Sequence, residues 1–90
     1  MITAQIIING LVQGVSFRYY TKKTALSLGL TGFVKNLKDG SVEIVVRGNK
    51  DNINKLINWC KKGSEQAKVE NVKIKEINLI EKFNLFEIRY

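Results

Sequence analysis

The 90-residue sequence contains no histidine, no proline and one cysteine, Cys60. Without histidine and with a single thiol, the chain cannot form a Cys/His zinc site, and Ser-His, Cys-His and phosphohistidine mechanisms are excluded. One cysteine also cannot form an internal disulfide, which is typical of proteins in a reducing cytosol. We therefore expect a cytoplasmic location.

Long apolar runs are absent too. No segment approaches the roughly 20 apolar residues that a membrane span requires, and residues 1–10 lack the basic start of a signal peptide. We therefore expect no membrane association. The length allows one domain over residues 1–90, and the apolar fraction of 44% is sufficient for one small core.

Acidic residues are few. The chain has 8 Asp and Glu and 15 Lys and Arg, which gives a net charge of +7. This balance favours an anionic partner and leaves nucleic acid, phosphorylated metabolites and acidic surfaces open. The charge is unevenly distributed: residues 1–17 carry no charged side chain, and the first one in the chain belongs to Arg18.

Hydrophobic periodicity divides the chain into strands and helices. Apolar side chains are almost continuous in the first strand, as expected at the centre of a sheet. They recur at helical spacing in two later segments, the second of which Asn49 can cap. Gly29 and Gly63 can end these helices, and Asp39-Gly40 is a strong hairpin signal. The predicted elements are strands over residues 3–9, 31–38, 41–48, 69–80 and 86–90 and helices over 17–28 and 50–62.

The order βαββαβ plus a short C-terminal strand predicts an α+β fold. It is typical of the ferredoxin-like α/β sandwich, one mostly antiparallel sheet with two helices on one face. Right-handed crossovers place the first and third strands at the centre. In the strand predicted over 69–80, the apolar residues Val72 and Ile74 stand at even-numbered positions, whereas Ile77 and Leu79 stand at odd-numbered positions. This switch in parity indicates a β-bulge near Lys75-Glu76.

The segment from Gly10 to Arg18 joins the first strand to the first helix. A glycine-containing loop there can direct several backbone N–H groups at one point, and the positive helix end adds to a site for phosphate. Arg18 in the first turn opposes the helix dipole unless a bound phosphate pairs with it. The alternative is that Gly10 and Gly14 only shape a turn and that Arg18 is solvated.

A longer set of motifs extends this pattern. The chain contains Gly10-x-Val12-Gln13-Gly14-Val15-x-Phe17-Arg18, then Gly32-x-Val34-x-Asn36, Asp39-Gly40-x-Val42-Glu43 and finally Phe86-x-Ile88-x-Tyr90. In these residues and their spacing, it resembles the acylphosphatase family over nearly its whole length. It departs at Lys35, where Arg is more usual, and at Ser64, where Pro is frequent. We expect both departures to affect surface charge and a loop rather than chemistry.

The resemblance implies a ferredoxin-like fold and hydrolysis of the carboxyl-phosphate bond of acyl phosphates to a carboxylate and orthophosphate, without cofactor or metal. It implies that Arg18 binds the phosphoryl oxygens and that Asn36 orients the attacking water. The substrate-binding loop would comprise Gln13, Gly14, Val15, Ser16, Phe17 and Arg18. Orthophosphate is then a product and an expected competitive inhibitor. The family places its last strand beside the second strand, whereas chain proximity favours the fourth.

Other functions are possible from the sequence. An RNA-binding module shares this topology but requires exposed aromatic residues on the third strand, and residues 41–48 contain none. We therefore expect no specific nucleic-acid partner. A noncatalytic anion-binding module, or a domain like those fused to carbamoyl-transferring maturation proteins, remains an alternative. We expect instead a freestanding, monomeric enzyme, because the chain stops at Tyr90 and lacks zinc-type cysteines.

The remaining reactive or charged side chains favour simpler interpretations. Cys60 and Trp59 lie on or near an apolar helical stripe, so they are expected in the core or at its rim. Asp39 and Asp51 fall in a turn and a helix far apart in the predicted fold, which argues against a metal site. The lysine pairs Lys22-Lys23 and Lys61-Lys62 are expected on solvated helix faces.

Overall fold

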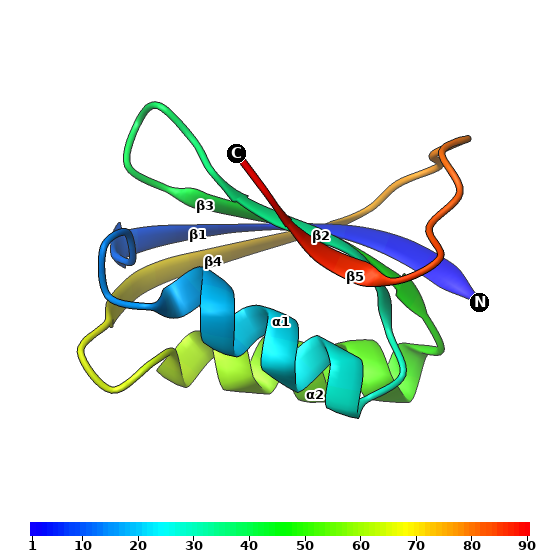
Figure 1. Cartoon of the computed structure of the whole chain (residues 1–90), viewed down its shortest axis with the longest axis horizontal. Coiled ribbons are helices and arrows are strands. Elements are labelled where there is room, and N and C mark those ends of the chain that lie inside the picture. Colours follow the sequence, from blue (N-terminus) through cyan, green and yellow to red (C-terminus); the bar gives the residue numbers. More distant parts are fainter.

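The computed structural model describes residues 1–90, which form a five-stranded sheet with two helices on one face (Figure 1). This is the predicted ferredoxin-like sandwich. The elements are β1 (Ile2–Leu11), α1 (Phe17–Ser27), β2 (Thr31–Asn36), β3 (Val42–Gly48), α2 (Lys50–Lys62), β4 (Lys68–Glu76) and β5 (Phe86–Arg89).

The strand order in the sheet is β4-β1-β3-β2-β5. As predicted, β1 and β3 pair with each other near the centre, and their pairing is antiparallel, as is that of β1 with β4 and of β2 with β3. The last strand, β5, pairs in parallel with β2. Its position confirms what the family resemblance implies, and chain proximity points to the wrong edge.

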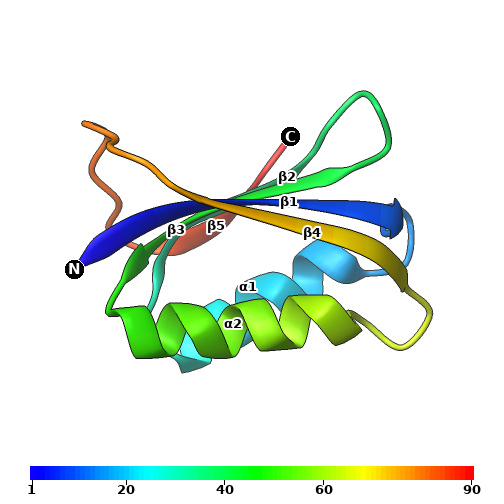
Figure 2. The same cartoon turned by 180° about the vertical axis from the view of Figure 1, so that it is seen from behind.

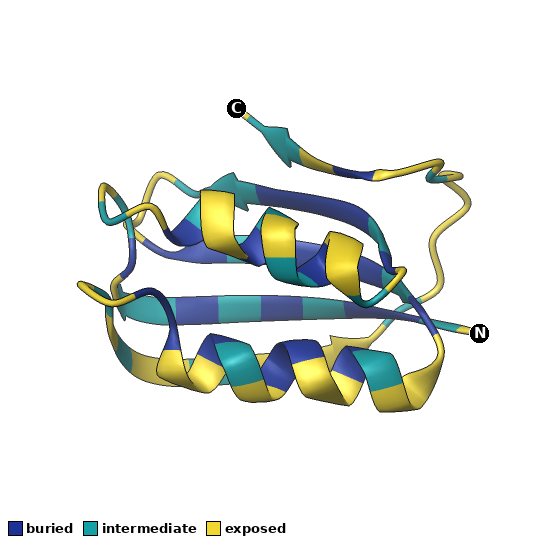
Figure 3. Cartoon of the chain, turned by 60° about the horizontal axis from the view of Figure 1, so that its bottom comes forward, coloured by how far each residue is buried: buried dark blue, intermediate teal, exposed yellow.

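Both helices bury one stripe against the same face of the sheet (Figure 3). Helix α1 packs against β2 and β5, while α2 lies over β4, β1 and β3. The core between the layers is built from aliphatic side chains of the central strands and from the buried stripes of the helices. It includes Ile6, Ile8, Val34, Ile44, Val46, Phe17, Ala25, Ile53, Leu56 and Cys60.

The fourth strand differs from the prediction. It ends at Glu76, and its irregularity lies opposite the step from Asn9 to Gly10 rather than at Lys75-Glu76. Beyond Glu76 the strand has almost no partner left, because β1 begins at Ile2 and only the Ile77 N–H still bonds to Thr3 O. The parity switch in the sequence therefore marks the end of the strand and not a bulge.

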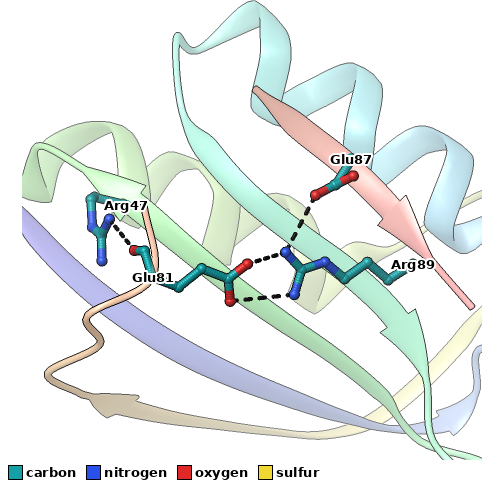
Figure 4. A network of polar contacts seen from close by, with 4 residues as sticks. All are labelled: Arg47, Glu81, Glu87 and Arg89. Carbon is teal, nitrogen blue, oxygen red and sulfur yellow. Dashed lines mark hydrogen bonds and ion pairs between the residues drawn. The ribbon is translucent and has the colours of Figure 1, made fainter. Parts of the chain in front are cut away.

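The connection between β4 and β5, residues 77–85, is fastened to the uncovered face of the sheet (Figure 4). Arg47 donates to Thr3 Oγ1 and to the backbone oxygens of Leu79 and Glu81. Arg89 forms ion pairs with Glu81 and Glu87. The Arg89 hydrogen bond to the Glu81 carboxyl also holds the pKa of that carboxyl below its ordinary value.

The uncovered face offers no aromatic platform. Phe33 is the aromatic side chain of this face, and it is only 7% exposed. The Arg89 guanidinium lies 4.1 Å from its ring centroid, and the Phe83 ring centroid lies 6.1 Å away. Base stacking requires open aromatic faces, so the covered ring disfavours RNA recognition here. No helix in the structure is both long enough and apolar enough to traverse a membrane.

Candidate active site

The loop between β1 and α1 is a rigid turn with buried ends. Gly10, at φ 128°, brings the backbone so close to β4 that a Cβ atom would lie 2.1 Å from Lys68 O. Val12 and Phe17, each 1% exposed, anchor the two ends of the loop in the core. Between them, Gly14 and Ser16 adopt left-handed conformations at φ 75° and 61°. These constraints restrict the conformations available to the loop.

Helix α1 begins without a cap. Ser16 precedes it and accepts no backbone hydrogen bond through its side chain, and the first turn contains no acidic residue. The first helical bond runs from Tyr20 N–H to Ser16 O at 3.2 Å, so the N–H groups before Tyr20 precede the helical ladder. Their partial positive charge is reinforced by the half-buried Arg18 in the first turn. The local field at this point favours an anion.

The Gln13 side chain joins the loop to the β2–β3 hairpin. Its Nε2 donates to Leu37 O at 2.8 Å and to Ser41 O at 2.9 Å. The same two residues close the hairpin through the Leu37 N–H bond to Ser41 O. Gln13 thereby fixes the loop next to the end of β2, and both lie at the same end of the sheet (Figure 1).

Ser64 ties the loop from the other side. Its hydroxyl donates to Val15 O at 2.8 Å, and the residue is 8% exposed. We expect the departure at Ser64 to affect a loop rather than chemistry, and the structure shows that this loop is joined to Val15 of the predicted substrate-binding loop. Gly63, at φ 78°, allows the turn that carries Ser64 to approach α1. A Cβ atom at this position would lie only 3.1 Å from the Phe17 ring.

Asn36 ends β2 on the face that the helices cover. It has the same parity as Val34, which is fully buried in the core, whereas Lys35 points to the other face and pairs with Glu43. The Asn36 Oδ1 atom is buried and has no hydrogen-bond partner. Such an atom is costly unless something donates to it. Because solvent does not reach Oδ1 in this conformation, the amide must rotate before the oxygen can accept a hydrogen bond from a water beside the loop.

Tyr90 follows β5 at the end of the sheet where β2 ends. The parallel pairing of β5 with β2 sets Arg89 opposite Lys35, so continuing that register brings Tyr90 beside Asn36. The Arg18 guanidinium carbon lies 5.0 Å from the centroid of the Tyr90 ring. Tyr90 is itself 98% exposed, so this cation–π contact lies at the surface, at the end of the sheet where β2 ends. Arg18 and Asn36, the predicted pair, therefore lie at the same end of the sheet.

Other groups offer no competing chemistry. Cys60 is fully buried, and burial raises the pKa of its thiol to about 12, so it is a core residue as predicted. Trp59 packs against Phe17 with ring centroids 5.2 Å apart. No group of three or more His, Cys, Asp or Glu side chains is arranged to hold a metal ion. The loop and Asn36 can hold an anion and a water molecule, which is a suitable arrangement for phosphoryl transfer.

Sequence reasoning missed three contributors to this arrangement. It assigned Gln13 to the loop amides and did not see its side-chain tie, and it gave Ser64 and Tyr90 no part in the site. The parity of Phe86, Ile88 and Tyr90 could have placed Tyr90 on the helix side of the sheet. The bonds of Gln13 and Ser64 had no signal in the sequence, since both depend on backbone oxygens brought near by the fold.

Fold and loop together define a ferredoxin-like domain whose first helix starts without a side-chain cap. The acylphosphatase family model matches residues 4–88. An acylphosphatase of Caldivirga maquilingensis is 44% identical over 90 residues, 99% of this chain and 95% of the relative. The crystal structure of acylphosphatase from Bacillus subtilis matches at a TM-score of 0.95 and 37% identity over 100% of both chains.

The same domain also occurs within a larger protein. The crystal structure of T. kodakarensis HypF matches at a TM-score of 0.85 and 31% identity, over 100% of this chain and 12% of that chain. The chain belongs to the acylphosphatase family, and its relatives of similar length are acylphosphatase enzymes. The resemblance seen in the sequence motifs is confirmed.

Proposed function

We propose that the protein hydrolyses acyl phosphates at the β1–α1 loop, by in-line attack of water on phosphorus. The observation that carries this proposal is the pairing of an uncapped helix start that bears Arg18 with the unpartnered Asn36 Oδ1 beside it. The first binds the phosphoryl group, and the second accepts a hydrogen bond from the attacking water. Family membership supports the choice of acyl phosphates as substrates.

Arg18 and the loop amides from Gln13 to Arg18 stabilise the transferring phosphoryl group. A guanidinium binds two phosphoryl oxygens at once, and preorganised N–H donors gain strength where charge develops in the transition state. Because Val12 and Phe17 are buried and Gln13 and Ser64 hold the loop from two sides, these donors need little reorganisation. This is positioning and electrostatic catalysis without a covalent intermediate.

The chemical step needs no group that the site lacks. Water attacks phosphorus, the bond between phosphorus and the carboxyl oxygen breaks, and the electron pair leaves with the carboxylate. The proton of the water passes to a phosphoryl oxygen of the substrate, which leaves as orthophosphate. A carboxylate is a good leaving group and needs no general acid, so the absence of histidine is no obstacle.

Several finer properties follow from this proposal. The reaction proceeds without metal or cofactor, because Arg18 and the amides supply the positive charge. Orthophosphate inhibits competitively, since it binds the same donors. We further propose that the 90 residues act as one monomeric domain in the cytoplasm. The lone buried thiol, which suits a reducing compartment, supports that location.

The test follows the ultraviolet absorbance of benzoyl phosphate in ¹⁸O-labelled water, with and without chelator. We expect saturable hydrolysis that chelator does not change, competitive inhibition by phosphate and the heavy oxygen in orthophosphate. Label in benzoate instead would mean attack at the acyl carbon and would contradict the mechanism. A pH profile that requires an enzyme carboxylate near neutrality would contradict the proposed substrate base.

A further inference from the structure

A groove opens beside the loop, between the start of α1 and the turn from α2 to β4. Its volume is about 710 Å³. Two of its lining residues, Val15 and Ser16, belong to the proposed substrate-binding loop, so the groove is continuous with the anion site. The others come from α1, α2 and the turn, and they include Tyr20, Trp59, Lys62 and Glu65.

The groove lies on the opposite side of the loop from Asn36. The loop follows β1, which has β4 on one side and β3 and then β2 on the other. Asn36 ends β2, whereas the groove is formed by the turn that leads into β4 (Figure 2). Gln13 fixes the loop on the β2 side, and Ser64 fixes it on the groove side.

In-line displacement places the attacking and leaving oxygens on opposite sides of phosphorus. If Asn36 holds the water, the carboxylate leaves away from β2, toward the turn between α2 and β4. We infer that this groove binds the acyl group of the substrate and that it favours an uncharged aromatic acyl group. The inference rests on the proposed function, because it uses the water position assigned to Asn36.

The walls of the groove suit an aromatic ring. Tyr20 is 43% exposed, and Trp59 is half-buried with its ring against Phe17, so both present aromatic surface. Lys62 and Glu65 both line the groove and bring charges of opposite sign, which gives no net preference for a charged acyl group. An acetyl group is too short to bury much surface there, whereas a benzoyl ring can contact the aromatic walls.

The first test compares kcat/KM for benzoyl phosphate and acetyl phosphate in the wild type, Tyr20→Ala and Tyr19→Ala. We expect the wild type to favour benzoyl phosphate and Tyr20→Ala to reduce that preference about three- to tenfold, the range for one aromatic contact, mainly through KM. Tyr19 is the matched control, because its exposed ring contacts the Tyr20 ring, at 5.0 Å between centroids, but does not line the groove. Its removal should leave the preference within twofold. An unchanged preference in Tyr20→Ala would overturn the inference.

A second test does not depend on turnover. Benzylphosphonate carries an aromatic ring on a phosphorus–carbon bond that water does not cleave. We expect it to bind more tightly than methylphosphonate in calorimetry and to lose about three- to tenfold in affinity in Tyr20→Ala. Equal binding of the two phosphonates would refute the inference that the groove binds the acyl group, even if both acyl phosphates are hydrolysed. Hydrolysis of neither acyl phosphate would refute the proposed function instead.

Discussion

The two helices of this protein begin in opposite ways. Asn49 caps α2 by accepting a hydrogen bond from Asn52 N–H at 2.8 Å, and Asp51 places a negative charge in its first turn. Helix α1 has neither feature, and the second residue of its first turn, where α2 has Asp51, is the cationic Arg18. One helix start is satisfied by its own side chains, while the other leaves its donors without a side-chain partner, which suits the anion site that we propose there.

The arginines show the same division. Arg47 and Arg89 use their donors on oxygen atoms of the chain, in the network that fastens residues 77–85. Arg18 forms no ion pair and instead lies against the face of the Tyr90 ring. An aromatic face orients a guanidinium without occupying its hydrogen-bond donors. Stability and the proposed ligand binding therefore use the same residue type in different surroundings.

The largest effect is expected where the uncapped helix loses its cation. Arg18→Ala should reduce kcat for benzoyl phosphate at least 100- to 1000-fold, the order seen when a transition-state donor is removed. Affinity for orthophosphate, measured by calorimetry, should weaken as well. The free energy of unfolding should stay constant or rise slightly, because the removed charge opposes the helix dipole.

Arg47→Ala is the matched control for this variant. It removes an arginine with three hydrogen bonds to the chain, so the free energy of unfolding should fall by about 1–3 kcal/mol. Turnover below the melting transition should change less than twofold, since Arg47 lies at the other end of the sheet. Comparable turnover losses in both variants would show that the two arginines do not differ as the structure indicates.

The next largest effect distinguishes the proposed positioning of water from the proposed binding of the phosphoryl group. Asn36→Ala removes the unpartnered acceptor at the end of β2 but none of the loop donors. We expect a loss in kcat of about 100-fold or more with orthophosphate affinity within threefold of the wild type. If calorimetry shows that Asn36→Ala and Arg18→Ala weaken phosphate binding equally, the proposed division of roles between them is wrong.

Much of this contrast was predictable from the sequence. Asn49, the helical stripe of α2 and Gly63 predict the bounds of that helix, because capping and periodicity are local. The glycine loop and the charge of Arg18 predict an anion site for the same reason. Apart from β4, the bounds of the elements differ from the prediction by at most two residues.

The failures involve contacts between distant segments. The parity of β4 indicated a bulge, but where β4 ends depends on the length of β1 and on Arg47, whose donors hold the chain beyond it. Ser64 reads as a surface loop residue, and only the fold reveals that Val15 O lies within its reach. The edge taken by β5 required knowledge of a family, since a parallel pairing with β2 has no local signal.

A third variant would make the start of α1 resemble that of α2. Tyr19 is exposed in the first turn, and Tyr19→Glu would place a carboxylate there, as Asp51 does in α2. Compared with Tyr19→Gln, which likewise lacks the ring that packs edge-on against Tyr20, the acid should raise the free energy of unfolding by about 0.3–1 kcal/mol through the helix dipole. It should also weaken orthophosphate binding about three- to tenfold, because like charges repel close to the loop.

Tyr19→Gln is the neutral control for that variant, since it loses the same ring without gaining a charge. Its phosphate affinity should equal that of the wild type within twofold, and high salt should restore much of the affinity of Tyr19→Glu. If both variants bind phosphate equally at low salt, the field at the start of α1 does not govern anion binding.

The smallest effect on activity is expected at the capped helix. Asn49→Ala removes the only side-chain acceptor for the first turn of α2 and should lower the free energy of unfolding by about 1 kcal/mol, or the melting temperature by about 4–8 °C. Asn49→Asp should retain stability, because aspartate caps equally well and suits the dipole. Since Asn49 follows the end of β3 that pairs with Ile2, away from the loop, kcat and KM should change less than twofold in both variants. A loss of turnover in Asn49→Ala without a change in unfolding would mean that the start of α2 also serves the active site, and the contrast between the two helix starts would not hold.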